Sequence, residues 1–167
     1  AIAVETATFD VSDPEAVRKG VSDVQAKVGP IDILVNNAGM QHRSTVAEFA
    51  DADWRRLMAT NLDAPFYMAR AVIPAMQERR AGKIINVAAR AGLAGSANHA
   101  AYSASKAAVM RITESIAAEV RDKGINANCI LPSTIDTADN RAAMPKADNS
   151  KWVKPESLAE VILFLAS

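Results

Sequence analysis

The sequence has few cysteines, few aromatic residues and no excess of charge of either sign. Its 167 residues include one cysteine, 5% aromatic residues, and 19 basic side chains against 19 acidic ones. The single cysteine, Cys129, forms no internal disulfide, which is typical of cytoplasmic proteins. The balanced charge argues against a surface for nucleic acids or anionic membranes. We therefore expect a cytoplasmic protein whose partner is a small-molecule substrate, with no nucleic acid and no membrane.

Long apolar runs and clusters of metal ligands are also lacking. The apolar runs are short and interrupted by charge, which excludes a membrane-spanning helix. The N-terminal stretch has no basic region before its apolar residues, so no secretory signal is visible. The two histidines, His42 and His99, show no ligand spacing, so we expect no metal site. The length suits a single domain, residues 1–167.

The apolar pattern predicts strands that alternate with helices. The predicted strands cover residues 2–9, 31–35, 83–87 and 125–131, and the predicted helices cover 14–28, 51–58, 66–76, 101–120 and 154–166. Strands that are apolar on both faces favour a parallel sheet covered by helices on both sides, which is a doubly wound α/β fold. Ligands of such sheets bind at the carboxyl ends of the strands. We therefore expect functional residues directly after the strands.

A tyrosine and a lysine are spaced for proton transfer at the start of the helix 101–120. Tyr102 and Lys106 are four residues apart, which places both side chains on one helix face. A free tyrosine has a pKa of ~10, and a neighbouring ammonium favours the phenolate. The pair can then exchange a proton with an alcohol or carbonyl oxygen. The same spacing is also common on solvated helix faces, so this interpretation needs further support.

That support comes from a second motif. Asn-Asn-Ala-Gly at 36–39 follows one predicted strand, and Tyr-x-x-x-Lys at 102–106 follows another. Together these motifs resemble the short-chain dehydrogenase/reductase family, and the likeness covers the whole chain. The resemblance implies a Rossmann-like, three-layer α/β/α fold. It also implies an oxidoreductase that transfers hydride between NAD or NADP and a small carbonyl, alcohol or dihydropterin-like substrate.

The resemblance further implies roles for individual residues. Tyr102 would be the general acid/base, Lys106 would hold the nicotinamide ribose and lower the Tyr102 pKa, and Asn61 would order a water in a proton relay. Further cofactor contacts would come from Asp10, Val11, Asn37, Ala38, Gly39, Pro132, Ile135 and Thr137. Asn37 would also hold the strand ends together. The expected substrate contacts are Gln41, Ala89 and Arg90.

Other interpretations of these residues stay open. Asn37 and Gly39 can simply stabilise a turn, and Asn61 can bond two helices. His42 and His99 can either touch substrate or lie on loop surfaces. A homodimer or homotetramer is implied, with the helices at roughly 63–80 and 101–120 pairing across a two-fold axis. The apolar residues that favour this pairing are Phe66, Met68, Val72, Met76, Val109, Met110 and Ile112.

One position departs from the family pattern. The family usually has a serine thirteen residues before the tyrosine, where this chain has Ala89. Removal of a hydrogen-bond donor to a developing oxyanion commonly slows a reaction by about 10²–10³-fold. The substrate therefore needs little carbonyl polarisation, or another group such as Ser96 or Arg90 substitutes, or the chain is a relative that binds a nucleotide or a partner without turnover.

Two segments point to different subgroups. Ala89 and the segment 132–152 resemble the quinonoid dihydropteridine reductases. Met-Gln-His-Arg at 40–43 is instead similar to sugar-acid and hydroxybutyrate dehydrogenases of the same family.

The glycine-rich phosphate-binding turn of the family is lacking. No two of the seven glycines are separated by a single residue, and such a turn brings backbone N–H groups to the pyrophosphate. The N-terminal β-α-β unit, the residue that selects NAD or NADP, and the last strand are also missing. In the strand order 3-2-1-4-5-6, two strands are then lacking between 2–9 and 31–35. We therefore expect residues 1–167 to be a fragment, or the ordered part, of a longer chain.

Overall fold

A three-stranded parallel sheet forms the centre of the molecule. The computed structural model describes residues 3–167. The strands β1 (Ile33–Asn36), β2 (Gly82–Val87) and β3 (Ile125–Ile130) lie in the order β1-β2-β3, with β2 in the middle. Both pairs are parallel. The predicted parallel sheet and the α/β fold class are therefore confirmed.

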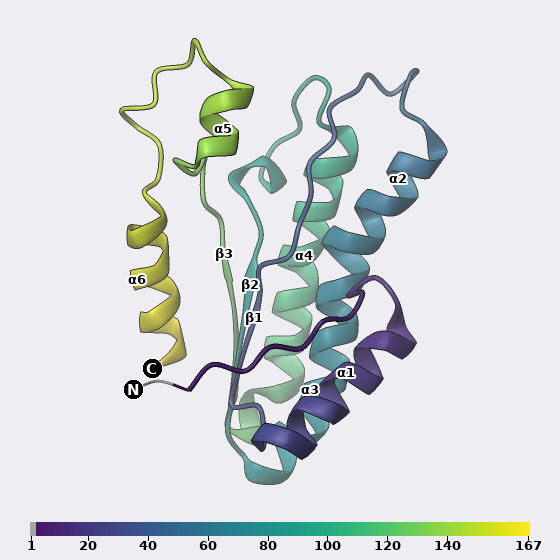
Figure 1. The fold of residues 1–167 in the computed structure, drawn as a ribbon, viewed down its shortest axis with the longest axis vertical. Helices are drawn as coiled ribbons and strands as arrows, with labels where there is room; N and C mark the ends of the chain where they lie inside the picture. The colour runs from purple at the N-terminus through teal and green to yellow at the C-terminus, as the bar shows by residue number, and fades with distance from the viewer. Residues whose placement is uncertain (1–2) are drawn as a thin grey trace.

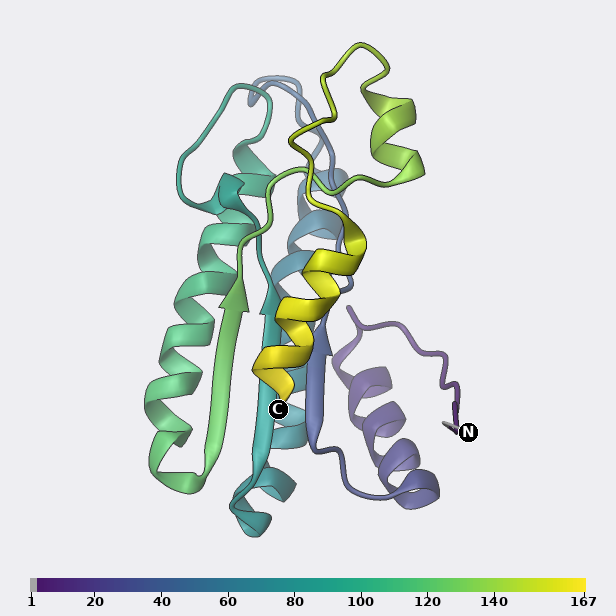
Figure 2. The ribbon, with the colours of Figure 1, turned by 90° about the vertical axis from the view of Figure 1, so that its left-hand side faces the viewer.

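Helices cover both faces of this sheet. On one face lie α1 (Pro14–Val28), α3 (Ala64–Arg79) and α4 (Ala100–Val120), and on the other lies α6 (Pro155–Ala166) (Figures 1 and 2). The core lies between the sheet and the helices α1, α3 and α4. It is built from Val17, Val21, Leu34, Ala69, Val72, Met76, Ile84, Ile116, Val120 and Ile125. No described helix is long and apolar enough to cross a membrane.

The helix boundaries follow from local sequence signals. The Asp13 side chain accepts hydrogen bonds from two backbone N–H groups of the first turn of α1, Pro14 occupies its first position, and Gly29 ends it with a φ of 114°. Gly124, with a φ of 73°, stands between the end of α4 and β3. A Cβ there would meet the carbonyl oxygen of Arg80, so only glycine fits.

The predicted strand at residues 2–9 is wrong for the described residues 3–9, which form no strand, and Ile2 lies outside the described residues. A strand needs a partner for its backbone N–H and C=O groups, and the two strands expected beside it do not occur within residues 3–167. The segment instead runs beside α1, away from the sheet (Figure 2). Its Phe9 ring packs on α1 at Gly20, where a Cβ would clash with it.

Several short helical elements were not predicted, among them a 3-10 turn, η3 (Arg121–Lys123), directly after α4. A π-helical turn, Ala59–Asp63, joins α2 (Asp51–Met58) to α3, so that the two predicted helical segments are continuous. The predicted loop 88–100 contains a 3-10 turn, η2 (Arg90–Gly92). The polar segment before α6 contains α5 (Ala138–Ala143). α5 lies at the end of the molecule where the strands have their carboxyl ends (Figure 1).

Candidate active site

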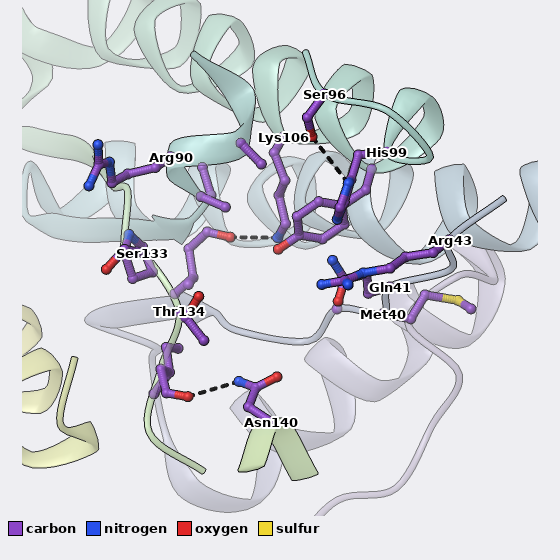
Figure 3. A pocket seen from close by; sticks show the side chains of 18 of the residues that line it. Met40, Gln41, Arg43, Arg90, Ser96, His99, Lys106, Ser133, Thr134 and Asn140 are labelled. Atoms are coloured by element: carbon purple, nitrogen blue, oxygen red, sulfur yellow. Dashed lines mark hydrogen bonds between the residues drawn. The ribbon is translucent and has the colours of Figure 1, made fainter. Parts of the chain in front are cut away.

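A cavity of about 580 Å³ opens at the carboxyl ends of the three strands. This volume is within the usual range for small-molecule sites. It lies among the segments that follow β1, β2 and β3 and the first turns of α4 (Figure 3). The predicted site residues that line it are Asn37, Gly39, Gln41, Ala89, Arg90, Tyr102, Lys106, Pro132 and Ile135.

The tyrosine and the lysine face the same cavity. The Lys106 Nζ lies 5.8 Å from the centroid of the Tyr102 ring, so the two side chains share one face of α4. The Nζ donates a hydrogen bond of 2.8 Å to the carbonyl oxygen of Val87 at the end of β2. Lys106 is buried, with 6% of its surface exposed, whereas Tyr102 is half-buried and open to the cavity. The bond to Val87 therefore fixes the lysine beside an accessible phenol.

Burial controls the ionisation of both groups. It raises the pKa of Tyr102, which is the opposite of the expected lowering by the Lys106 ammonium. It also lowers the pKa of Lys106, against a smaller opposing effect of Cys129. The expectation was wrong in direction for the chain alone, because burial disfavours the charged phenolate and accounts for the shift of the Tyr102 pKa. Tyr102 is consequently a neutral phenol, ready to give a proton, at physiological pH.

Asn61 ties the loop after β1 to α4. It is 1% exposed in the π-helical turn, and its Oδ1 accepts a 2.8 Å hydrogen bond from the N–H of Met40. Its Nδ2 donates to the Met40 carbonyl oxygen at 2.9 Å and to the Ser105 Oγ on α4 at 3.2 Å. A Cβ at Gly39 would lie 3.5 Å from Asn61 Oδ1 and 3.6 Å from Lys106 Nζ. The two side chains therefore converge at Gly39, and π turns of this kind often occur at functional sites.

The strand ends are joined by Asn36 rather than by Asn37. The Asn36 Nδ2 donates a 2.8 Å hydrogen bond to Asn86 Oδ1, and the Asn86 Nδ2 donates one of 2.8 Å to Thr113 Oγ1 on α4. All three side chains are buried. The expected strand-holding role of Asn37 was misplaced by one residue, because alternation along β1 buries Asn36 and exposes Asn37 to the cavity.

The wall at the end of β2 has no hydroxyl group. Ala89 is 8% exposed and lines the cavity, while Arg90 is exposed at the start of η2. Sequence reasoning missed Gly92, which lets η2 lie against the backbone of α4. A Cβ there would be 2.8 Å from the carbonyl carbon of Lys106. The sequence could not predict this contact, because Gly92 is a single glycine in a loop and belongs to no recognisable motif.

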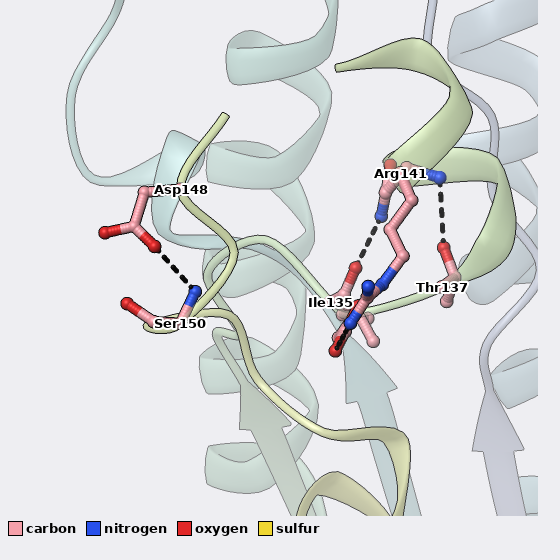
Figure 4. A network of polar contacts seen from close by, with 7 residues as sticks. Ile135, Thr137, Arg141, Asp148 and Ser150 are labelled. Carbon is pink, nitrogen blue, oxygen red and sulfur yellow. Dashed lines mark hydrogen bonds and ion pairs between the residues drawn. The ribbon is translucent and has the colours of Figure 1, made fainter. Parts of the chain in front are cut away.

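Five predicted residues lie outside this cavity. Asn61 lies behind its wall, and Val11 and Ala38 line a smaller hollow that shares Asn37 with it. Asp10 is exposed, and hydrogen bonds from the Ser12 Oγ and N–H to its carboxylate lower its pKa. Thr137 caps α5, where its Oγ1 accepts a hydrogen bond from the Asn140 N–H (Figure 4). Their cofactor contacts stay predictions.

The segment after β3 covers the cavity with residues that sequence reasoning missed. Ser133, Thr134, Asn140 and Met144 line the cavity, and Asn140 Nδ2 donates a 2.8 Å hydrogen bond to the Ile135 carbonyl oxygen. Farther from the cavity, Arg141 pairs with Asp136, a contact that lowers the Asp136 pKa (Figure 4). Ser133 and Thr134 follow β3 directly, where functional residues were expected, whereas only the fold of α5 brings Asn140 and Met144 to the cavity.

The cavity carries positive charge. Arg43, Arg90 and Lys106 line it, and no carboxylate is among the described residues of its wall. The chain as a whole is neutral, so this concentration of cations is local. Such a wall attracts anionic ligands. Within residues 3–167, no group of three or more His, Cys, Asp or Glu side chains is placed to hold a metal ion.

Comparisons with known proteins agree with this geometry. The family model described as short chain dehydrogenase matches residues 2–148. Nodulation protein G of Azospirillum brasilense is 37% identical over 166 residues, which cover 95% of this chain and 68% of the relative. Gluconate 5-dehydrogenase of Gluconobacter oxydans (strain 621H) is 35% identical over 172 residues, which cover 97% of this chain and 67% of the relative.

A solved structure shares the fold. It is the gluconate 5-dehydrogenase of Burkholderia cenocepacia J2315 in complex with NADP and tartrate, with a TM-score of 0.89 and 35% identity. The match covers 95% of this chain and 66% of that one, so the chain spans about two thirds of the length of its relatives. The resemblance to dihydropteridine reductases is not confirmed by these relatives. The family model and the shared fold show that the chain belongs to the short chain dehydrogenase family, which confirms, at the level of the family, its predicted class as an NAD(P)-dependent oxidoreductase.

Proposed function

We propose that this protein interconverts a small carbonyl compound and its alcohol, with NAD(P) as the hydride carrier and Tyr102 as the general acid/base. The observation that carries the proposal is the placement of Tyr102 and Lys106. Both lie on one face of α4 and line a cavity at the carboxyl ends of parallel strands. A hydroxyl and an ammonium that converge on one cavity are suited to moving a proton to or from a substrate oxygen.

The cavity fits the nicotinamide end of the cofactor. Asn37, Gly39, Pro132 and Ile135 give it a wall of small and neutral side chains, and Lys106 contributes a hydrogen-bond donor suited to a ribose hydroxyl. A glycine-rich turn for the pyrophosphate is not part of this chain. NAD(P)H, when bound, supplies the hydride.

The residues of the chain supply the proton. Tyr102 is protonated at neutral pH, because the ordinary tyrosine pKa is ~10 and burial raises the Tyr102 pKa further. The phenol therefore gives its proton to the substrate oxygen during reduction, and the phenolate takes one back during alcohol oxidation. Lys106 stands beside the ring and stabilises the phenolate that forms. The proposed role of Asn61 in a proton relay is indirect, since its buried side chain bonds Met40 and Ser105 and thereby fixes the loop beside Lys106.

The charge of the cavity supports an acidic substrate, such as a sugar acid or another small hydroxy acid. Arg43, Arg90 and Lys106 line the cavity without a compensating carboxylate among its described residues. Two relatives are gluconate 5-dehydrogenases, and the structure of one of them contains tartrate. A dihydropterin-like substrate is the second candidate, because Ala89 removes the hydroxyl that normally polarises a carbonyl group.

A homodimer or homotetramer is the proposed assembly, with an interface smaller than expected from the sequence. Val72, Met76 and Val109, which were expected to favour pairing, are buried inside the chain and face the core. Phe66 is 43% exposed on α3 and remains available for a partner copy. Light scattering on the purified protein, compared with a Phe66→Ser variant, measures this assembly.

The activity is tested by following NADH and NADPH oxidation with small oxo acids and with neutral ketones. Tyr102→Phe removes the proton donor and should lower turnover by about 10²–10⁴-fold, while cofactor binding measured by fluorescence stays within about threefold of the wild type, a change of less than 1 kcal/mol. Tyr67→Phe, a change at the other tyrosine, serves as the matched control. Unchanged turnover in Tyr102→Phe would overturn the mechanism. Cofactor binding without any turnover by the wild type would instead support a non-catalytic relative.

A further inference from the structure

We infer that His99 donates a hydrogen bond to the reacting oxygen of the substrate, in the place where the family serine is replaced by Ala89. The inference rests on the proposed function, because it concerns the same substrate oxygen that Tyr102 protonates. Ala89 lines the cavity but has no polar atom beyond its backbone. The oxygen that receives the proton then lacks a second donor at that wall, unless another side chain supplies one.

His99 is placed beside Tyr102 on the cavity wall. It is the N-cap residue of α4, three positions before Tyr102, and residues so spaced lie on the same side of a helix. Their ring centroids are 6.5 Å apart in an edge-on arrangement, and both rings line the cavity. Both rings can therefore approach one small ligand. Figure 3 shows His99 on the side of the cavity where Arg43 also points.

Two groups contact His99 Nδ1, and they favour opposite tautomers of the ring. The Ser96 Oγ lies 3.1 Å from His99 Nδ1, and the Ala97 carbonyl oxygen lies 3.0 Å from the same nitrogen. A hydroxyl that donates to Nδ1 leaves the hydrogen on Nε2, whereas a carbonyl group can only accept and would draw it to Nδ1. The proposed role of His99 requires the Ser96 hydroxyl to donate to Nδ1, which leaves Nε2–H free to donate to substrate. Ser96 acts through His99 and is a positioning residue.

The loop that carries these residues is held in a constrained conformation. The Ser44 N–H donates to the Asn98 carbonyl oxygen at 3.3 Å, and the His99 N–H donates to the Ser96 carbonyl oxygen at 3.2 Å. Asn98 has a φ of 63°, a left-handed conformation that is unfavourable for most residues with a side chain. These contacts fix the backbone on which His99 is presented.

Arg90 and Ser96 are weaker choices for the missing donor. Arg90 is exposed, and Figure 3 shows it at the far side of Lys106 from His99. Ser96 is exposed, and its hydroxyl is already engaged with the imidazole. His99 is only partly exposed and adjoins the phenol.

The first test is a double-mutant cycle with kcat for carbonyl reduction as the readout. His99→Leu should lower kcat by about 10²-fold, whereas His99→Gln, which keeps an N–H donor, should retain most of it. His42→Leu is the matched control, because His42 contacts Phe49 and Asp53 outside the cavity and should leave kcat unchanged. Thermal melts show that each variant is folded.

The Ala89→Ser background shows whether His99 and a serine at position 89 act on the same substrate oxygen. If the new hydroxyl donates to the same oxygen, His99→Leu should lower kcat by less than about tenfold in that background, since the effects of two residues with one function are not additive. An equal loss in both backgrounds would overturn the inference, as would full activity of His99→Leu in the wild-type background.

A second readout does not depend on turnover. Nitrogen-15 NMR of the imidazole rings, assigned with the His42→Leu variant, should show the Nε2–H tautomer for His99 in the wild type. Ser96→Ala should convert it to the Nδ1–H tautomer and lower kcat, and Ser96→Thr should restore both. An Nδ1–H tautomer in the wild type would overturn the inference. A wild type that shows Nε2–H but no turnover with any carbonyl compound would contradict the proposed function instead.

Discussion

The cavity has two walls that are built in different ways. The inner wall, Tyr102 and Lys106 with Asn61 directly behind them, stands on helices, and Asn61 and Lys106 are almost fully buried. The outer wall, Arg43, Arg90 and His99, lies in the loop after β1, at the start of η2 and at the N-cap of α4, with both arginines exposed. The comparison teaches that the groups proposed to move the proton stand on rigid elements, whereas the other groups proposed to contact the substrate are carried by loops and by the end of a helix.

The largest expected effect comes from Lys106→Met on the inner wall. Loss of the ammonium should lower kcat by about 10²-fold or more and weaken cofactor binding. Burial lowers the pKa of Lys106, which means that the protein holds this charge at a cost in folding stability. The melting temperature should therefore stay equal or rise. Lys83→Met, at a lysine whose Nζ bonds an exposed Asn126 side chain, is the control for activity and melting. A stability loss with normal kcat would make Lys106 a structural residue only.

Asn61→Ala should break the link between the inner wall and the loop that carries Arg43. It removes three hydrogen bonds and leaves buried polar groups without a partner, which costs roughly 1–3 kcal/mol for each such group. Urea unfolding measures the free energy change, and kcat should also fall, by about tenfold. Asn126→Ala, at an exposed asparagine of β3, should change neither quantity noticeably. A stable Asn61→Ala protein would refute the anchoring role.

On the outer wall, Arg43→Gln should change substrate affinity rather than chemistry. With an acidic carbonyl substrate KM should rise by about tenfold, since a hydrogen bond to a charged group contributes roughly 1.5 kcal/mol, while kcat stays constant. A neutral ketone should show no change in KM. Arg55→Gln on α2, where Arg55 pairs with Asp51, is the matched control. A fall in kcat with unchanged KM would place Arg43 in the proton chemistry and remove the distinction between the walls.

The smallest effect is expected for Ala89→Ser. The new hydroxyl would restore the family donor at a site where His99 already serves, so kcat on neutral ketones should rise by only about threefold, at the low end of one hydrogen bond. A rise of more than about 10²-fold, the effect of a missing oxyanion donor, would show that the wild type has no second donor.

Local signals predicted most of the fold, and they failed where long-range pairing decides. The apolar segments 2–9 and 125–131 look equally strand-like, yet only the second has a neighbouring strand to bond, which is β2. A period of two along a sequence indicates what a strand would bury, but it does not provide a partner.

The candidate site was predictable in its inner wall because Tyr102 and Lys106 are close in sequence and lie on one helix. Met144 and Asn140 were not, since their approach depends on α5, a short helix in a polar segment. The direction of the Tyr102 pKa shift also escaped prediction, because burial is a property of the folded wall and not of the spacing.

The pH dependence of the two reaction directions tests the account most directly. Because burial raises the pKa of Tyr102, the phenol that reduction requires is fully present from pH 6 to 9, and the phenolate that alcohol oxidation requires is scarce. The rate of reduction at saturating cofactor should be flat over this range, whereas the rate of oxidation should rise about tenfold per pH unit. A flat oxidation profile, or the same rise in Tyr102→Phe, would contradict Tyr102 as the group that exchanges the proton.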